Sequence, residues 1–360
     1  MINESRLLDT FLTLVRIDSP SGEEAAISQE LALRLKRHGL QVVQDYMHNI
    51  QAWLPGEGEP LLLAAHMDTV MPGRSINPVV RDGVVRSDGS TILAADDKSG
   101  IAVILEVLQA LSESGVKHPP LEVLVTVQEE TGLTGVKALD TSGLKSRIGL
   151  SFDAGDAPGT IIVSAPTHNM VTAVVHGKAA HAGSEPEAGV NAILVAAEAV
   201  TNMPIGRIDS ETTANIGVIK GGLARNIVPD RVELLGEARS RQKAKLQVQT
   251  DKMVDALRSA AQRHDAQVDV DVQRAYDGYQ LSESDAVVSR LMAACRAVGV
   301  EPLLVPSGGG SDANILNARG VQVANLSTGM AGVHTVQEHI AVQDMVTCVR
   351  IVLEFIRSLI

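Results

Sequence analysis

The sequence predicts an α/β protein, with a mostly parallel mixed sheet and flanking helices plus an inserted ferredoxin-like α+β domain. Continuous apolar runs at 61–65, 121–127 and 148–152 are typical of strands buried on both faces. A helical pattern separates these runs, and the texture of the chain changes between residues 168 and 275. We therefore expect a larger domain in two parts, 1–167 and 276–360, around an inserted domain, 168–275.

The first part of the chain alternates helices and strands. Apolar residues at helical spacing predict a helix near 7–15, and "SGEE" at 21–24 predicts a capping box for a second helix that ends near Gly39. Strands are predicted at 40–45 and 50–56, and the stretch "KSGIAVILEVLQALSES" predicts a helix over 98–114. This order is the βαβ rhythm of a sheet with crossover helices.

The middle of the chain predicts a β-α-β-β-α-β order, which is the ferredoxin-like arrangement. Its predicted elements are strands at 170–177, 213–222, 232–240 and 267–276, and helices at 189–203 and 245–264. The remainder returns to amphipathic helices at 284–299 and 344–360.

Composition excludes several classes of partner. A net charge of −12 argues against a nucleic acid and against an anionic membrane surface. The two cysteines, Cys295 and Cys348, lie in apolar helical patterns and are expected to be buried free thiols. No signal peptide or apolar stretch of membrane-spanning length is found, so we expect a cytoplasmic protein.

Ligand-type residues follow three of the predicted buried strands. The run 61–65 leads into His66 and Asp68, the run 121–127 into Glu129 and Glu130, and the run 148–152 into Asp153, while Asp96 stands at the start of the next helix. The carboxyl ends of strands in open α/β sheets are where ligands bind. We therefore expect these side chains to meet at one edge of the sheet.

An imidazole among several carboxylates predicts a divalent metal site, because clustered like charges are costly without a cation. The acids outnumber the ligands of one tetrahedral zinc, which indicates two ions that share a carboxylate. Each motif alone has a structural alternative: "DDKSG" at 96–100 also suits a helix cap, and "EE" a polar loop entry. The remaining histidines show no clustered acid partners in the sequence, namely His38, His48, His118, His168, His176 and His264.

Six stretches of the sequence are informative as a set: "AAHMDTVMPG", "SDGSTILAADDKSGIA", "VQEETGLTGVKAL", "GKAAHAGSEPEAGVNAI", "ARNIVPDRVELLGEARS" and "HTVQEHI". They resemble the successive motifs of the peptidase T branch of the co-catalytic dinuclear zinc exopeptidases. That clan also includes carboxypeptidase G and succinyl-diaminopimelate desuccinylase. The resemblance covers both predicted domains.

The resemblance implies two divalent ions, zinc with cobalt or manganese as alternatives, and assigns their ligands. Asp96 would bridge the ions, Glu130 and His334 would hold one of them, and His66 and Asp153 the other. The peptide between Asp96 and Asp97 is expected to be cis. Ala94 stands where the family pattern has a glycine.

Further roles follow from the same resemblance. Glu129 resembles the general base, Asp68 the carboxylate that orients the ligand imidazole, and His181 the histidine that steadies the oxyanion. Asn226 and Arg239 resemble a substrate-binding pair, and Gly309 and Gly310 in "SGGGSDAN" offer backbone amides to the substrate. Packing or surface roles for His181 and Arg239, and a plain turn for the glycines, remain alternatives.

The resulting hypothesis is a dinuclear metallopeptidase that acts on short peptides, with a tripeptide aminopeptidase favoured. A carboxypeptidase or an N-acyl amino acid amidohydrolase with the same metal site is the alternative, and a non-catalytic dimeric binding protein is disfavoured because ligands and base are all present. A homodimer is expected through the inserted domain, which would act as lid and dimerisation domain.

Overall fold

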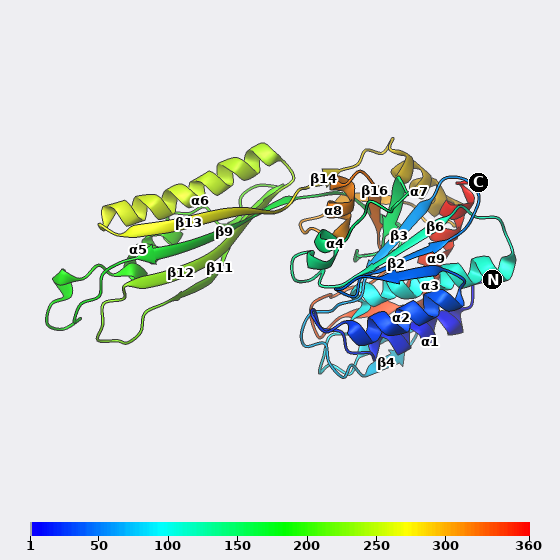
Figure 1. Cartoon of the computed structure of the whole chain (residues 1–360), viewed down its shortest axis with the longest axis horizontal. Helices are drawn as coiled ribbons and strands as arrows, with labels where there is room; N and C mark the ends of the chain where they lie inside the picture. Colours follow the sequence, from blue (N-terminus) through cyan, green and yellow to red (C-terminus); the bar gives the residue numbers. More distant parts are fainter. Residues whose placement is uncertain (1) are drawn as a thin grey trace. The chain divides into compact units, whose positions relative to one another are not determined.

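The computed structural model describes residues 2–360, which form two compact units. One unit contains the residues up to Ser164 together with Gln280–Ser307 and Ser311–Ile360. The other contains Ala165–Tyr279 and Gly308–Gly310. Figure 1 labels the elements of both units.

The larger unit is built on a mixed sheet that is nine-stranded within residues 2–360. The strand order is β1-β2-β6-β3-β7-β16-β8-β14, and β15 pairs with β8. Its strands are β1 (Gln41–Gln44), β2 (Ile50–Leu54), β3 (Leu61–His66), β6 (Leu121–Thr126), β7 (Ile148–Ser151), β8 (Thr160–Ala165), β14 (Tyr279–Gln280), β15 (Leu303–Pro306) and β16 (Gln322–Leu326).

The centre of this sheet is parallel, because β3 pairs in parallel with both β6 and β7, and β7 pairs in parallel with β16. Every residue of β3 and β6 is buried. A strand buried along its whole length must be covered on both faces, which explains why these strands are continuous apolar runs rather than alternating ones. The α/β class predicted from those runs is confirmed.

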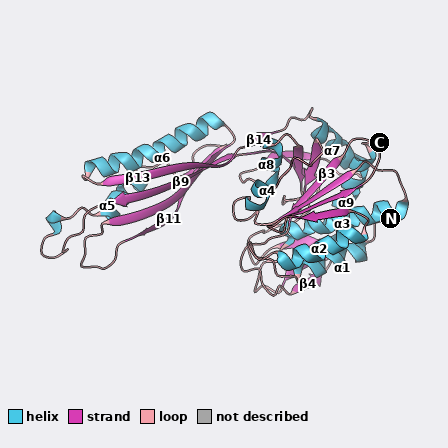
Figure 2. Ribbon diagram, viewed as in Figure 1, coloured by secondary structure: helices cyan, strands magenta, loops and turns pink. Residues whose placement is uncertain are grey.

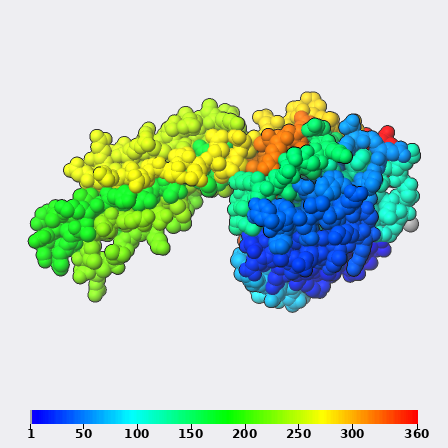
Figure 3. All heavy atoms as spheres, in the orientation of Figure 1, coloured from blue at the N-terminus to red at the C-terminus, as the bar shows by residue number. Residues whose placement is uncertain are grey.

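Helices flank the sheet, as the secondary-structure colouring of Figure 2 shows. They are α1 (Glu4–Val15), α2 (Ala25–Arg37), α3 (Ala95–Ser114), α4 (Thr134–Ala138), α7 (Ala286–Ala297), α8 (Asp312–Ala318) and α9 (Val342–Arg357). Helices α1, α3 and α9 contact one another, and α3 packs against β3. Figure 3 shows α1 and α2, in blue, at the surface of this unit.

A separate antiparallel sheet of β4 (Pro78–Arg81), β5 (Val84–Ser87) and β17 (His339–Ala341) completes the larger unit. It brings the segment before α9 beside the segment before α3, since His339 pairs with Arg86. These short strands were not predicted from the sequence. They link two distant stretches that both carry candidate ligands.

The capping box predicted at 21–24 is wrong. Helix α2 begins at Ala25, and its N-cap residue Glu24 makes no side-chain cap hydrogen bond. The Ser21 hydroxyl instead donates to Asp68 Oδ2 at 2.6 Å, and Glu24 Oε1 accepts the backbone N–H of Gln128 at 3.0 Å. The polar side chains before the helix are therefore used in tertiary contacts with the strand ends.

The smaller unit has the strand order β10-β11-β12-β9-β13, with antiparallel pairing throughout. Its elements are β9 (Thr167–His176), the 3-10 helix η1 (Pro186–Ala188), α5 (Ala192–Thr201), β10 (Gly206–Arg207), β11 (Thr212–Gly221), β12 (Arg231–Ser240), α6 (Lys243–Arg263) and β13 (Gln267–Tyr276). Apart from the short β10, this is the chain order and sheet order of a ferredoxin-like fold. Its core packs the inner face of β9 and β12 against α5 and α6.

Candidate metal centre

The candidate ligands follow the parallel strands at one edge of the larger unit's sheet. His66 is the last residue of β3 and pairs with Thr126 at the end of β6. Glu129 and Glu130 follow β6, and Asp153 follows β7. Because these strands run in the same direction, their carboxyl ends bring residues from distant stretches together.

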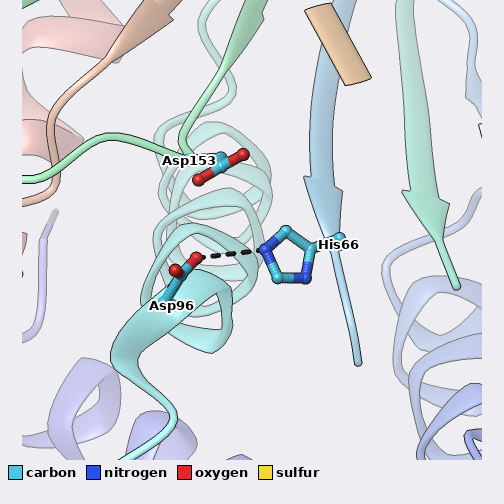
Figure 4. A group of neighbouring side chains, drawn as sticks. All are labelled: His66, Asp96 and Asp153. Atoms are coloured by element: carbon cyan, nitrogen blue, oxygen red, sulfur yellow. Dashed lines mark hydrogen bonds and ion pairs between the residues drawn. The ribbon is translucent and has the colours of Figure 1, made fainter. Parts of the chain in front are cut away.

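Among the described residues, three groups place one ligand atom per residue within 4.8 Å of one another. The first contains His66, Asp96 and Asp153, which Figure 4 shows turned toward a common space. The second contains Asp96, Glu130 and His334. Imidazole nitrogens with carboxylate oxygens are a donor set that suits zinc and similar divalent ions, so both groups fit a metal. Asp96 belongs to both.

Asp96 stands between the two histidines. Its Oδ1 lies 3.0 Å from His66 Nε2, and its Oδ2 lies 3.3 Å from His334 Nε2. Burial favours the neutral acid, but hydrogen bonds from His334 and His66 outweigh it and lower the pKa of Asp96. The carboxylate therefore stays ionised, with one oxygen directed to each group. The peptide bond between Asp96 and Asp97 is cis, which confirms that expectation.

His334 also contacts Glu130, with 2.8 Å between Nε2 and Glu130 Oε1. Hydrogen bonds to Asp96 and Glu130 raise the pKa of His334 to about 10. A proton and a divalent cation satisfy the same carboxylates in different ways, and a metal ion would displace this proton from the imidazole.

Asp68 connects the strand ends. Its buried carboxylate accepts the backbone N–H groups of Glu129 at 2.9 Å and Glu130 at 3.2 Å. His66 Nδ1 lies 3.1 Å from the Asp68 carbonyl oxygen and 3.4 Å from Asp68 Oδ1. These acceptors hold the Nδ1 proton and leave Nε2 facing Asp96, which is the arrangement that a metal-binding imidazole requires.

Glu129 is almost fully buried, and its burial raises the pKa of the carboxyl well above its usual range. Neighbouring acids, Asp312 first, add to this effect. A carboxyl group with a raised pKa suits a residue that accepts and returns a proton near neutral pH. Glu129 also belongs to the third group, with His66 and Glu130, so its proximity alone does not separate a ligand from a base.

Sequence reasoning gave no role to two buried groups near the centre. Lys98 is fully buried, its ammonium donates to the Ile17 carbonyl at 2.8 Å, and burial lowers its pKa to about 7. Asp312 accepts a hydrogen bond from Thr126, and burial raises its pKa to about 6. Lys98 lies in "DDKSG" and Asp312 in "SGGGSDAN", so their places in these two motifs were the available signal.

The residues of the smaller unit to which the family resemblance assigns roles form two separate groups within that unit. His181 and Asn226 are neighbours, because the backbone N–H of Ala182 donates to the Asn226 carbonyl at 3.0 Å. The ring nitrogen Nδ1 of His181 accepts the backbone N–H of Gly183 at 3.1 Å and of Ser184 at 3.0 Å. These bonds fix the orientation of the imidazole.

Arg239 and Gly310 belong to the second group of candidate residues in the smaller unit. The Arg239 guanidinium donates to both carboxylate oxygens of Glu237, at 3.0 and 2.9 Å. A Cβ added to Gly310 would lie 2.3 Å from the ring of Tyr276, whose centroid is 5.2 Å from that of His168. Gly309, the neighbour of Gly310, lies in the same short stretch of this unit.

Three histidines described above as lacking acid partners have them in the fold. His168 Nε2 lies 3.1 Å from Glu237, His176 Nε2 lies 2.9 Å from Asp269, and His264 Nε2 lies 2.5 Å from Glu198. Antiparallel pairing and helix packing create these contacts across 66 or more residues of sequence, where spacing carries no signal.

The fold and the candidate centre together define a class of protein, namely an α/β protein with a carboxylate-histidine cluster that fits divalent metal ions at the carboxyl ends of parallel strands. The model of peptidase family M20/M25/M40 matches residues 62–358 of the chain. The chain belongs to this family, and it is a metallo-exopeptidase, a hydrolase that acts on peptide bonds.

Similar proteins cover the chain almost completely. The "Uncharacterized protein YqjE" of Bacillus subtilis is 40% identical, over 99% of both chains. The crystal structure of aminopeptidase PepT from Bacillus cereus has a TM-score of 0.91 at 39% identity and covers 99% of both chains. That of a tripeptidase from Staphylococcus aureus has a TM-score of 0.95 at 39% identity, covering 100% of this chain and 99% of the other. Within residues 2–360, no helix is long and apolar enough to cross a membrane.

Proposed function

We propose that the protein is a dinuclear metal-dependent aminopeptidase that releases the N-terminal residue of tripeptides. The observation that carries the dinuclear part is the position of Asp96, whose two oxygens face two different histidines and which belongs to two ligand groups. The substrate part is supported by an aminopeptidase and a tripeptidase at 39% identity over nearly the whole chain.

Two divalent ions, zinc in our proposal, would be held by His66, Asp96 and Asp153 and by Asp96, Glu130 and His334. When bound, such ions polarise the scissile carbonyl and lower the pKa of water. Asp68 keeps the His66 imidazole oriented and fixes the backbone of Glu129 and Glu130 through their N–H groups.

Glu129 is proposed as the general base. Its carboxylate accepts a proton from the attacking water, and the resulting carboxylic acid donates that proton to the nitrogen of the leaving amine as the peptide C–N bond breaks. The raised pKa that burial gives this carboxyl supports both halves of the transfer. His181 is proposed to donate to the developing oxyanion, and Asn226, Arg239, Gly309 and Gly310 to bind the substrate.

The decisive experiment combines metal depletion with a Glu129→Gln variant. Chelation should abolish hydrolysis of a free tripeptide, and zinc, cobalt or manganese should restore it. Glu129→Gln should bind two ions and lose about 10²- to 10⁴-fold in kcat, since a positioned base contributes that much. A wild-type turnover number in this variant, or undiminished activity in protein proven metal-free, would refute the proposal.

Blocked peptides separate the substrate hypotheses. An aminopeptidase should reject an N-acetylated tripeptide and accept one with an amidated C-terminus. A carboxypeptidase or an N-acyl amino acid amidohydrolase should accept the acetylated compound. A panel of free di-, tri- and tetrapeptides at equal concentration then tests the length preference through kcat/KM.

We also propose a homodimer that forms through the smaller unit. Support comes from apolar side chains on the sheet face opposite α5 and α6, where Met170, Val218 and Leu235 are each more than 40% exposed. Light scattering on the full chain tests this, and a monomeric mass at micromolar concentration would contradict it. The cytoplasmic location stays a prediction from the sequence.

A further inference from the structure

Glu338 is a buried acid whose carboxylate accepts hydrogen bonds from the backbone of a stretch that is distant in the sequence. Only 1% of the residue is exposed. Its Oε2 accepts the backbone N–H of Leu93 at 2.7 Å and of Ala94 at 2.8 Å, and its Oε1 accepts the backbone N–H of Asp96 at 3.0 Å. The contact joins stretches that lie 242 or more residues apart in the chain.

These three donors belong to the start of α3, which lacks a cap of its own. The N-cap residue is Ala94, which has no side-chain oxygen and adopts a left-handed conformation with φ 62°. Successive backbone N–H groups in such a turn form an anion-binding concavity, and the first N–H groups of a helix need acceptors. Glu338 provides them, so the Asp96 carboxylate is not needed as a cap.

The other side of the contact is the loop that carries His334. His334 also has a left-handed backbone, with φ 62°, which a residue with a Cβ adopts only when its surroundings impose it. The loop is closed by a two-way hydrogen bond between Ala331 and His339, at 2.9 Å in each direction. The backbone N–H of Glu338 donates to Thr335 at 3.1 Å inside this loop.

From these contacts we infer that Glu338 is a positioning residue that locks Asp96 and His334 into one ligand group. Glu338 accepts the backbone N–H of Asp96 and follows His334 by four residues, and both Asp96 and His334 belong to the group Asp96, Glu130 and His334. The group His66, Asp96 and Asp153 shares only Asp96 with that contact. The inference rests on the proposed dinuclear function and adds to it that one ion depends on Glu338 more than the other.

The test is a Glu338→Gln variant compared with a Glu122→Gln variant. The glutamine amide keeps the size of the side chain but turns one acceptor oxygen into a donor that faces a backbone N–H. Glu122 is a matched control because it is 2% exposed and accepts the backbone N–H groups of Lys145 and Ser146, on the same unit. It precedes the ligand end of β6 by four residues.

Each apo-enzyme is titrated with Co²⁺, and binding is measured by calorimetry and by the visible absorption of the bound cobalt. Glu338→Gln should lower the affinity for one of the two ions by about tenfold or more, as changes to groups that orient metal ligands do. Glu122→Gln should leave both affinities within about twofold of wild type while lowering thermal stability. Equal weakening in both variants would mean that Glu338 is merely structural.

Single-ion backgrounds identify which ion responds. With Asp153→Asn, the remaining ion uses His334, and adding Glu338→Gln should lower its affinity about tenfold or more. With His334→Ala, the remaining ion uses His66, and the same change should have a clearly smaller effect. Glu338→Asp, which keeps the charge, should recover part of the affinity.

Different results would refute the proposed function and the role of Glu338. Wild-type protein that binds no cobalt would contradict the proposed function itself. Wild-type protein that binds two ions, together with a folded Glu338→Gln variant of unchanged affinity and unchanged cobalt spectrum, would overturn only the role of Glu338.

Discussion

Gly100, in the first turns of α3, tests how tightly the candidate centre is packed. A Cβ added there would lie 2.3 Å from Asp97 Oδ1 and 2.5 Å from Phe152 Cβ. Side-chain Cβ atoms essentially never approach other atoms within 3.0 Å, so Gly100→Ala must push both neighbours away. Phe152 directly follows β7, and because its Cβ is bonded to the backbone, a rotamer change cannot relieve that contact.

Two opposing effects set the size of the change. Alanine favours a helix interior over glycine by about 1 kcal/mol. Overpacking of a closed core costs about 1–3 kcal/mol, and here two contacts are violated at once. We therefore expect a net loss of about 2 kcal/mol in the free energy of unfolding of the larger unit, against the direction that helix propensity predicts.

The displaced residues adjoin Asp96 and Asp153, so the same variant should also weaken the ion held by His66, Asp96 and Asp153. Urea unfolding of the apo-protein and Co²⁺ titration measure the two effects. Gly143→Ala is the control, because a Cβ at Gly143 meets no atom within 4 Å and should change stability by less than about 1 kcal/mol. A Gly100→Ala protein as stable as wild type, with unchanged cobalt affinity, would refute the packing argument.

Two further predictions concern the smaller unit. Gly310→Ala should lower kcat/KM about tenfold or more, because its Cβ would enter the ring of Tyr276, while Gly308→Ala, which meets no atom within 4 Å, should stay within about twofold; similar values for both variants would contradict this. The His168 imidazole holds the pKa of Glu237 down to about 2, below its ordinary 4.5, so the ionised carboxylate stabilises the fold above pH 4.5 and this contribution is lost as the pH falls toward 2. The stability difference between wild type and Glu237→Gln should therefore shrink over that range in pH-dependent urea unfolding, and a constant difference would exclude the coupling.

The central sheet and the candidate ligands could be predicted because a strand buried on both faces appears in the sequence as a continuous run of apolar residues. The apolar runs of β3, β6 and β7 end at the carboxyl ends of these strands. His66 and Asp153 follow two of the runs directly, and Glu129 follows the third after Gln128. Because the strands pair in parallel, the residues that follow them lie at the same edge of the sheet. The geometry of the centre thus follows from features that single segments of sequence carry.

The supports of the centre leave no such trace. Ser21 looked like a helix cap and is a hydrogen-bond donor to Asp68. Glu338 lies in the motif "HTVQEHI", four residues after His334, which indicates a residue beside the ligands, but its backbone partners lie 242 or more residues earlier and spacing does not identify them. The strands β5 and β17 that bring these stretches together have only 4 and 3 residues, too few for an alternation of buried and exposed residues to stand out in the sequence. Contacts of this kind depend on the three-dimensional arrangement, so local pattern cannot predict them.

The two adjacent aspartates at the start of α3 show how such supports decide function. Asp96 keeps a non-helical backbone, with ψ 109°, and each of its oxygens faces a histidine. Asp97 is fully buried, and its Oδ2 accepts the backbone N–H of His66 at 3.3 Å. One aspartate therefore presents its carboxylate to the centre, while the other fixes the backbone of the histidine opposite. This division is possible because Glu338 satisfies the N–H groups that an aspartate at a helix start would otherwise cap.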